Sequence, residues 1–286
     1  MKVAAYQAPL LVSASTEITI RLLRERVEWC ESEGVEILCC PEGVLGGLAD
    51  YTPSPTAIAL DAQGGQLETV LAPLASDRVT TIVGFTEVDQ RGRLYNSAAV
   101  LHRGLVVGLY RKLYPAIHKS FYEPGDRMPV FTVGDLTFGI LICLDSTYYE
   151  PARIMAAQGA AVLFVPTNNG MPPAKGGAEL VAEARNRDIA RAIENNVSVV
   201  RADVAGRAGD LVSYGTSGIV DRNGTVLGAA RQLESDVVVA DIKTAPLEPR
   251  PAWDPARNPA VADEYTRLVA RTYAADVRTT TSSELV

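Results

Sequence analysis

Residues 136–158 read LTFGILICLDSTYYEPARIMAAQ, with an apolar run first and a segment of helical character last. The apolar run extends to Ile142, and its length and composition are typical of a buried β-strand. Cys143 ends that run, and the helical segment Pro151–Gln158 follows and is terminated by Gly159. A strand, a turn and a helix in this order predict one unit of an α/β fold, with Cys143 in the turn.

The rest of the chain continues this alternation of buried strands and amphipathic helices. Further helices are predicted where apolar residues recur at helical spacing, at Thr16–Glu33, Gln66–Ser76 and Ala178–Asn195. Further strands are predicted at Val3–Gln7, Val35–Cys40, Thr80–Val88, Ala161–Pro166, Val197–Ala202 and Val237–Ile242. Turn residues predict three hairpins, Ser97–Leu101 with Val106–Tyr110, Val130–Val133 with Leu136–Ile142, and Gly218–Asp221 with Thr225–Ala229.

Strands that are joined partly by helices and partly by hairpins indicate mixed sheets with helices outside them. Both halves of the chain show this order, which favours an α/β fold of the helix–sheet–sheet–helix kind. We expect residues 1–243 to form this domain. Proline and charged residues become more frequent from Thr244 onward. Residues 244–286 are therefore predicted to form a C-terminal extension that packs on the domain or on a partner subunit.

The composition is that of a globular protein and argues against several classes of function. Hydrophobic residues make up 47% of the 286 residues, charged residues make up 21%, and the net charge is -7. An acidic chain offers no basic surface for nucleic acid or anionic membrane. No apolar run approaches the roughly 18 residues of a membrane span, and the first residues, MKVAAYQAPL, read as a strand rather than a signal peptide. We therefore expect a cytoplasmic protein.

Disulfide, metal and nucleotide sites find little support in the sequence. Two of the four cysteines, Cys39 and Cys40, are adjacent, which suits a reduced compartment better than a disulfide framework. His102 and His118 are the two histidines and there is no Cys-x-x-Cys pair, so no metal site is predicted. The sequence also lacks a P-loop and a Gly-x-Gly-x-x-Gly segment after a strand, and we expect no cofactor.

Cys143 is the first candidate for chemistry. A cysteine between a strand and a helix is presented at the edge of a sheet, where the backbone N–H of Leu144 can face a developing oxyanion. The alternative is a buried cysteine that only packs in the core, which is the more frequent fate of a single cysteine.

Two charged residues also lie where a predicted strand ends. Glu42 follows Val35–Cys40 and could act as a general base if burial raised its pKa. Lys112 follows Val106–Tyr110 and could stabilise an oxyanion or lower the pKa of a thiol. The alternatives are a glutamate that caps a turn and a solvated lysine.

Together these segments resemble the nitrilase superfamily, the carbon–nitrogen hydrolases with a Glu-Lys-Cys triad. Five segments that occur in family order between Gln7 and Asp241 carry the resemblance. They are Cys40-Pro41-Glu42; Tyr110-Arg111-Lys112-Leu113; Ile142-Cys143-Leu144-Asp145 with Glu150 and Arg153 after it; Arg191-Ala192-Ile193-Glu194-Asn195; and Gly215, Ser217 and Asp221. Each segment is weak alone, but five in order are specific, although the aromatic–Pro–Glu order before Arg153 is altered here.

The resemblance implies a four-layer α-β-β-α sandwich of the nitrilase type, and a homodimer or higher homo-oligomer joined through helices near the active site. It implies that Cys143 attacks the carbonyl carbon, that Glu42 moves the protons, and that Lys112 and the Leu144 N–H hold the oxyanion. It requires no metal or organic cofactor.

One position departs from the family pattern. Many members carry a second glutamate between the lysine and a Tyr-x-Pro-Gly segment, which here is Tyr122-Glu123-Pro124-Gly125. The matching position holds His118. Three readings follow: His118 takes the role of the glutamate, Glu123 reaches in from a shifted loop, or the role is missing.

Other residues are candidates for the wall of a substrate pocket. Asn168 and Asn169 follow a predicted strand, and Tyr148 follows the cysteine turn. The favoured activity is hydrolysis of a small carboxamide to an acid and ammonia. An N-carbamoyl amine or amino acid hydrolase and a nitrilase are the alternatives within the family. A non-catalytic binding protein on the same fold is the alternative from another class.

Overall fold

The strand β1 (Lys2–Pro9) is buried along most of its length. Its side chains alternate between two hydrophobic cores, with Val3 and Ala5 in one and Ala4 and Tyr6 in the other. Successive side chains of a strand point to opposite faces of its sheet. A core on each face therefore places β1 in a sheet that is covered on both sides, as expected for an inner layer of a layered fold.

The structure is a computed structural model that describes residues 1–11, 15–244, 259–264 and 266–267. The chain divides into two units, Met1–Glu248 and Pro249–Val286. The helices of the first unit are α1 (Thr16–Ser32), α2 (Gln66–Leu71), α3 (Tyr149–Ala157) and α4 (Ala178–Asn195). In the second unit, residues 259–264 and 266–267 are helical. The rest of the predicted C-terminal extension lies outside the described residues.

The larger sheet contains nine strands in the order β12-β11-β1-β2-β4-β5-β6, with β15 paired to β1 and β3 paired to β4. After β1, its strands are β2 (Ile37–Cys39), β3 (Leu60–Asp61), β4 (Thr80–Val88), β5 (Leu94–His102), β6 (Leu105–Arg111), β11 (Val204–Ala208), β12 (Leu211–Ser213) and β15 (Asp236–Asp241). β1 is parallel to β2 and antiparallel to β15, where Lys2 lies opposite Asp241 and Gln7 opposite Asp236.

The smaller sheet contains six strands in the order β14-β13-β10-β9-β8-β7. These are β7 (Val130–Val133), β8 (Leu136–Ile140), β9 (Val162–Pro166), β10 (Ser198–Ala202), β13 (Gly218–Val220) and β14 (Val226–Ala229). β8, β9 and β10 are parallel, and the outer strands join them in antiparallel pairs. The three predicted hairpins, β5–β6, β7–β8 and β13–β14, are confirmed.

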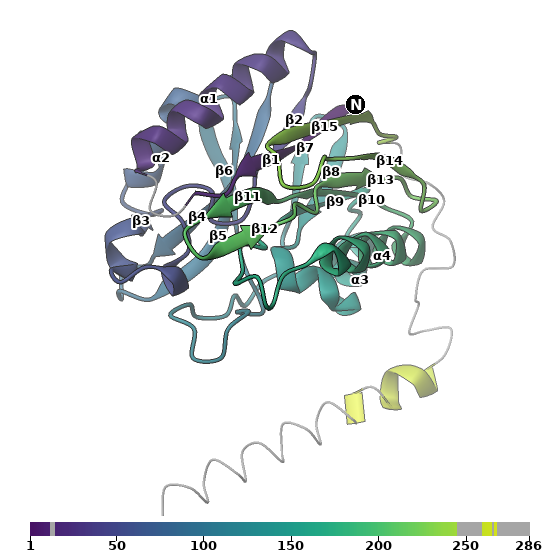
Figure 1. Ribbon diagram of the computed structural model, residues 1–286. Helices are drawn as coiled ribbons and strands as arrows, with labels where there is room; N and C mark the ends of the chain where they lie inside the picture. The colour runs from purple at the N-terminus through teal and green to yellow at the C-terminus, as the bar shows by residue number, and fades with distance from the viewer. Residues whose placement is uncertain (12–14, 245–258, 265, 268–286) are drawn as a thin grey trace, which may run out of the picture. The chain divides into compact units, whose positions relative to one another are not determined.

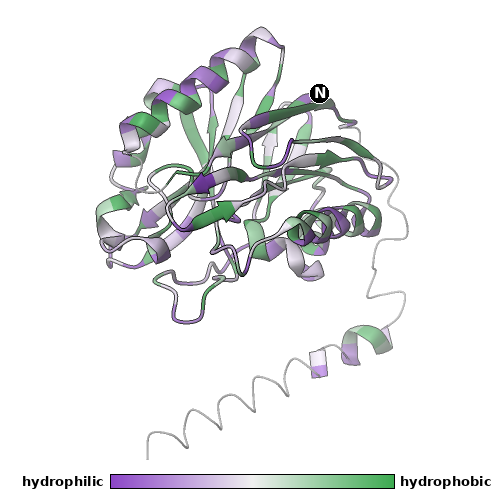
Figure 2. Ribbon diagram, in the orientation of Figure 1, coloured by the Kyte–Doolittle hydropathy of each residue, from purple (hydrophilic) through white to green (hydrophobic). Residues whose placement is uncertain are grey.

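The two sheets lie face to face, with α1 and α2 on the outer side of the larger sheet and α3 and α4 on the outer side of the smaller one (Figure 1). The helices are amphipathic, and much of their hydrophobic colouring in Figure 2 lies toward the sheets. One core contains residues of both sheets, and the other joins the larger sheet to α1 and α2. The predicted four-layer α-β-β-α sandwich is confirmed.

Three short strands, β3, β11 and β12, were absent from the sequence prediction. β11 and β12 contain or flank Gly206 and Gly209, both with positive φ, and their apolar pattern is too short to predict a strand. The helix predicted at Gln66–Ser76 ends as α2 at Leu71 and continues as a 3₁₀ turn, Ala72–Leu74. Pro73 explains this end because it lacks the N–H that an α-helix requires.

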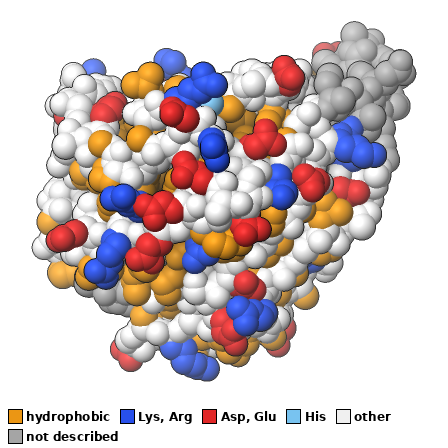
Figure 3. Space-filling view, turned by 90° about the horizontal axis from the view of Figure 1, so that it is seen from above, with side chains coloured by type: hydrophobic (Ala, Val, Ile, Leu, Met, Phe, Trp, Pro, Cys, Tyr) orange, Lys and Arg blue, Asp and Glu red, His pale blue; other side chains and the backbone are white. Residues whose placement is uncertain are grey.

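Positive and negative side chains are interspersed on the face of the molecule shown in Figure 3. Within the described part of the chain, no helix combines the length and the apolarity that a membrane crossing requires.

Candidate active site

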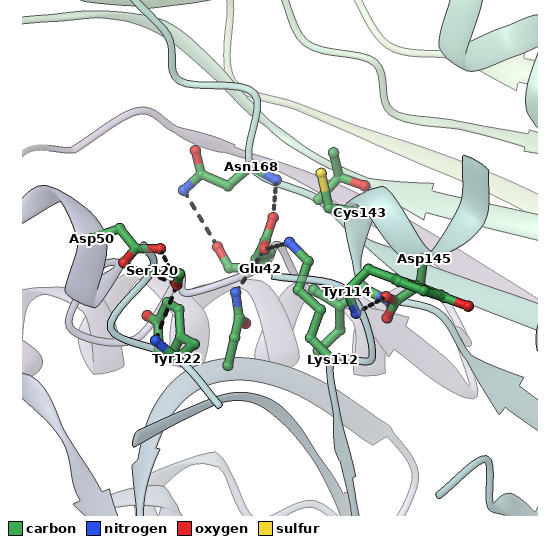
Figure 4. A network of polar contacts seen from close by, with 12 residues as sticks. Glu42, Asp50, Lys112, Tyr114, Ser120, Tyr122, Cys143, Asp145 and Asn168 are labelled. Carbon is green, nitrogen blue, oxygen red and sulfur yellow. Dashed lines mark hydrogen bonds and ion pairs between the residues drawn. The ribbon is translucent and has the colours of Figure 1, made fainter. Parts of the chain in front are cut away.

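Glu42, Lys112 and Cys143 come from three strands and meet between the two sheets. Glu42 follows β2 and Lys112 follows β6 in the larger sheet, whereas Cys143 follows β8 in the smaller sheet. Figure 4 shows the three side chains directed toward one another. The Glu42 and Lys112 side chains are buried, and Cys143 is partly exposed. The site therefore places a cysteine beside a buried ion pair.

The Glu42 carboxylate accepts hydrogen bonds from three donors. Lys112 Nζ donates to Oε1 at 2.6 Å and Asn96 Nδ2 donates to the same oxygen at 2.7 Å. The backbone N–H of Asn168 donates to Oε2 at 3.0 Å (Figure 4). A buried carboxylate without donors would be costly, and these three donors hold its oxygens in fixed positions.

Gly84 of β4 allows the backbone of Glu42 to approach the sheet closely. A Cβ atom at Gly84 would lie 2.4 Å from the carbonyl oxygen of Pro41 and 2.8 Å from Glu42 Cα. Both distances are far shorter than van der Waals contact, so only glycine fits without moving Glu42.

Lys112 is held at both its backbone and its side chain. Its N–H donates to the carbonyl of Asn96 at 2.8 Å, and its carbonyl accepts from the Gly125 N–H at 2.7 Å. Burial lowers the pKa of Lys112 more than any other single cause, but the charge and hydrogen bond of Glu42, together with the charges of Cys143 and Asp145, raise the pKa above its ordinary value. The lysine is therefore a cation throughout the physiological pH range.

Cys143 lies in a backbone conformation that is unusual for a residue with a side chain. Its φ is +48°, and it begins a 3₁₀ turn, Cys143–Thr147, directly after Ile142. A non-glycine residue in this region carries a strain of order 1–3 kcal/mol, which the surrounding structure must sustain. Figure 4 shows Cys143 beside Glu42 and Lys112, so the strained residue lies in the site.

Burial and the charge of Glu42 raise the pKa of the Cys143 thiol to about 12, and Lys112 and Arg201 oppose this rise. The resting site therefore contains a neutral thiol beside a carboxylate. Attack by the sulfur requires that a base removes the thiol proton, and Glu42 is the carboxylate whose charge acts most strongly on that thiol.

Asp145 fixes the turn that presents Cys143. Its Oδ2 accepts from the Ile142 N–H at 3.1 Å and from the Tyr110 hydroxyl at 2.7 Å, and its Oδ1 accepts from the Tyr114 N–H at 2.9 Å. These bonds join the cysteine turn to the segment that follows Lys112. Burial nevertheless raises the pKa of Asp145 to about 6, although Lys112 and the hydrogen-bond donors oppose it.

His118 and Glu123 lie on the loop after Lys112, and both side chains are exposed. The segment between them is fastened by Asp50, which accepts from the Ser120 hydroxyl at 2.8 Å and from the Phe121 N–H at 2.8 Å. The Glu123 N–H donates to the Leu94 carbonyl at 2.8 Å. In the part of the chain that the structure describes, no hydrogen bond joins either side chain to the three central residues.

The other four predicted pocket residues occupy different positions. Leu144 follows Cys143 in the turn and is partly exposed, and Asn168 contacts Glu42 through its N–H. Tyr148 is 40% exposed and its ring lies 4.1 Å from the ring of Tyr114. Asn169 is buried, and its amide Nδ2 donates to Asp203 Oδ2 at 2.8 Å.

The sequence prediction missed Asn96 as a residue of the site. Asn96 belongs to β5, is buried, and reaches Glu42 although β4 lies between β5 and β2 in the sheet. The signal in the sequence is a polar pair, Asn96-Ser97, inside an otherwise apolar strand, since a buried amide needs a partner.

A pocket of about 430 Å³ lies largely on the α1 side of the larger sheet. Gly43, Tyr51 and Asn168 line it together with mostly apolar side chains of β1, α1 and the loop after Gly43, whereas Glu42, Lys112 and Cys143 are not among its lining residues. Among the described residues, no group of three or more His, Cys, Asp or Glu side chains is arranged to hold a metal ion.

Comparison with known proteins gives consistent matches. The family model described as carbon-nitrogen hydrolase matches residues 2–277. A nitrilase from Pyrococcus abyssi is 35% identical over 219 residues, which cover 76% of this chain and 80% of that protein. An (R)-stereoselective amidase from Pseudomonas sp. is 34% identical over 207 residues, which cover 71% of this chain and 72% of that protein.

Among solved structures, a mutant of the amidase from Nesterenkonia sp. AN1 superposes on this chain with a TM-score of 0.73. That structure shows the result of Michael addition of acrylamide at the active site cysteine of the amidase. The match has 25% sequence identity and covers 88% of this chain and 97% of that chain.

Proposed function

The chain belongs to the carbon–nitrogen hydrolase family, which acts on non-peptide C–N bonds, and from this premise we propose that it hydrolyses a small carboxamide to a carboxylic acid and ammonia. The observation that carries the proposal is the buried ion pair between Glu42 and Lys112, at 2.6 Å, beside the thiol of Cys143. This arrangement combines a nucleophile, a base and a fixed positive charge.

In the proposed mechanism, Glu42 takes the thiol proton as the sulfur of Cys143 attacks the carbonyl carbon. The carbonyl oxygen becomes an oxyanion, which Lys112 and the Leu144 N–H stabilise. Lys112 Nζ has three N–H groups, so it can donate to Glu42 and to the oxyanion at once.

Collapse of the tetrahedral intermediate breaks the C–N bond and leaves a thioester on Cys143. Glu42 returns its proton to the departing nitrogen, which leaves as ammonia. Glu42 then removes a proton from a water molecule, whose oxygen attacks the thioester carbonyl. The C–S bond breaks and releases the acid, and Glu42 returns the proton to the sulfur of Cys143, which restores the resting thiol and carboxylate. The three hydrogen bonds that hold Glu42 suit this repeated use because they leave the carboxylate in one position.

We favour an amide over a nitrile because the family's nitrilases usually place the cysteine in a Cys-Trp-Glu context, whereas here Leu144 and Asp145 follow Cys143. Tyr148 and Asn168 are the predicted pocket residues best placed to contact the substrate, since one is exposed beside the cysteine turn and the other donates its N–H to Glu42.

The test is ammonia release from a panel of aliphatic, aromatic, dicarboxylic and N-carbamoyl amides, with the corresponding nitriles. We expect release by the wild type and by Cys30→Ala, which removes a fully buried cysteine of α1, and none by Cys143→Ala. Hydrolysis by Cys143→Ala would refute the mechanism. Release from nitriles alone would replace the amidase assignment by a nitrilase, and silence of the folded wild type across the panel would favour the non-catalytic alternative.

We also expect a homodimer or a higher homo-oligomer. Tyr149 and Ile154 of α3 and Ile193 of α4 are 38–50% exposed, and exposed apolar side chains on neighbouring helices favour self-association. Light scattering after size-exclusion chromatography measures the oligomeric state, and a monomer at micromolar concentration would contradict this expectation.

A further inference from the structure

Arg201 of β10 is a buried cation that contacts three other parts of the fold. Its Nε donates to Asp188 Oδ2 at 2.9 Å and its Nη2 donates to Asp188 Oδ1 at 2.5 Å, which forms a buried ion pair with α4. The guanidinium also donates to two hydroxyl groups. Nη2 donates to Ser146 Oγ and Nη1 donates to Thr167 Oγ1, each at 2.9 Å.

The contact with Ser146 leads to the nucleophile. Ser146 lies in the 3₁₀ turn that Cys143 begins, and its hydroxyl donates to the Cys143 carbonyl at 2.7 Å. A chain of two hydrogen bonds therefore runs from the Arg201 guanidinium to the backbone of Cys143. Because Cys143 has a φ of +48°, its conformation depends on such contacts.

The contact with Thr167 leads to the base. The Thr167 carbonyl accepts from the Glu42 N–H at 3.3 Å, and the next residue, Asn168, donates its N–H to Glu42 Oε2 at 3.0 Å. One planar guanidinium thus ties the support of the nucleophile to the support of the carboxylate. Five N–H groups in a rigid fork make such branching possible, and a lysine ammonium could not reproduce it.

The charge of Arg201 also acts on the thiol. The groups whose charges act most strongly on Cys143 are Glu42, Lys112, Arg201 and Asp203. Burial and Glu42 raise the pKa of the thiol, whereas the two cations lower it. Loss of Arg201 would therefore make the thiol still harder to ionise.

We propose that Arg201 is a positioning residue of the active site. Through Ser146 it holds the turn that begins at Cys143, and through Thr167 it holds the segment that hydrogen-bonds to Glu42. It does not touch the reacting atoms. This inference rests on the proposed function for its effect on turnover, but its effect on the thiol is independent of any substrate.

Three variants separate the parts of the proposal. Arg201→Lys keeps the charge and loses the fork, Arg201→Met loses both, and Ser146→Ala removes the link to Cys143 while it leaves the Arg201–Asp188 ion pair in place. Arg185→Met is the matched control. Arg185 is also an arginine near Asp188, with its Nη1 3.9 Å from Asp188 Oδ2, but its Nη2 donates to the Ser217 carbonyl rather than to the cysteine turn.

Two measurements are made on each variant after thermal unfolding has shown that it is folded. The first is kcat and KM for ammonia release, and the second is the rate of Cys143 alkylation by iodoacetamide against pH, with Cys143→Ala as the blank. We expect kcat to fall about 100-fold in Arg201→Lys and about tenfold in Ser146→Ala with little change in KM, because small misplacements of reacting groups have effects of this size. We expect the alkylation profile to move to higher pH in Arg201→Met alone.

Arg185→Met should change neither measurement. The proposal is overturned if folded Arg201→Lys and Ser146→Ala keep the wild-type kcat, or if Arg185→Met lowers kcat as much as they do. If Arg201→Met does not fold, the other two variants still decide the positioning role. If the wild type releases no ammonia, the proposed function has failed. Independently of that result, an unshifted alkylation profile in folded Arg201→Met would refute the effect of Arg201 on the thiol.

Discussion

Replacement of Glu42 by glutamine tests the centre of the site with a change of one oxygen to an amide nitrogen. The substitution removes the base and leaves the Lys112 ammonium buried without its counter-ion. General acid–base catalysis contributes about 10²–10⁴-fold to rates, so we expect kcat to fall by about 10³-fold or more. Substrate binding should change less, because a glutamine side chain has nearly the same shape as a glutamate side chain.

The stability effect follows from the same contacts. Glu42 Oε1 accepts from Lys112 and Asn96 and Oε2 accepts from the Asn168 N–H, so a glutamine must set its NH₂ against at least one donor. Removal of one partner of a buried ion pair costs about 3–5 kcal/mol. With about 2–4 °C per kcal/mol for a domain of this size, the melting temperature should fall by about 6–20 °C.

Glu87→Gln is the matched control for this prediction. Glu87 is another buried glutamate of the larger sheet, and it pairs with Arg111 at 2.6 Å and accepts from the Ser97 hydroxyl rather than from the central residues. Arg111 keeps some contact with water, so the control should lose less stability than Glu42→Gln and keep kcat within about threefold. The reasoning fails if folded Glu42→Gln retains more than a tenth of the wild-type kcat, or if Glu87→Gln loses as much activity.

Other measurements test the thiol, the cysteine turn and the close approach of β4. Because the pKa of Cys143 is about 12, the alkylation rate of the wild-type thiol should rise continuously between pH 6 and 10, and a plateau below pH 9 would contradict a neutral resting thiol. Burial raises the pKa of Asp145 to about 6, so the folded state holds a proton that the unfolded chain releases, and this group lowers the unfolding free energy as pH rises from about 4 to 6. Asp145→Asn should remove that contribution, so the unfolding free energies of the wild type and the variant should differ in slope between about pH 4 and 6, and kcat should fall. Parallel stability–pH curves for the two proteins would refute the assignment. Gly84→Ala places a Cβ atom 2.8 Å from Glu42 Cα, so we expect at least a tenfold loss of kcat in a folded variant, and unchanged kinetics would show that the strand can yield.

The sequence predicted the layers of the fold because its apolar patterns are long and regular. Strands such as β4 and β5 are buried on nearly every position, and the glycine turn Gly134-Asp135 identifies the hairpin between β7 and β8. β11 and β12 were missed because their stability comes from pairing with β1 and with each other rather than from a local pattern.

The same contrast applies to the candidate site. Glu42, Lys112 and Cys143 each follow a strand that the sequence predicts, and strand ends of a layered fold lie at common edges, so their meeting could be expected. Asn96 and Arg201 reach the site from the middle or end of other strands, and which buried polar group they meet depends on the packing of the sheets. No local pattern contains that information.

The pairing of β1 with β15 has a consequence for the synthesis of the protein. β1 leaves the ribosome long before β15, and its backbone donors and acceptors from Lys2 to Gln7 face Asp241 to Asp236. At 5–20 residues per second, about 230 residues of synthesis take on the order of 10–50 seconds. During that time one edge of a highly apolar strand lacks its partner, which is the condition under which nascent chains recruit chaperones or pair with one another. We therefore expect the yield of this protein in a cell to depend on the speed of translation and on chaperone supply.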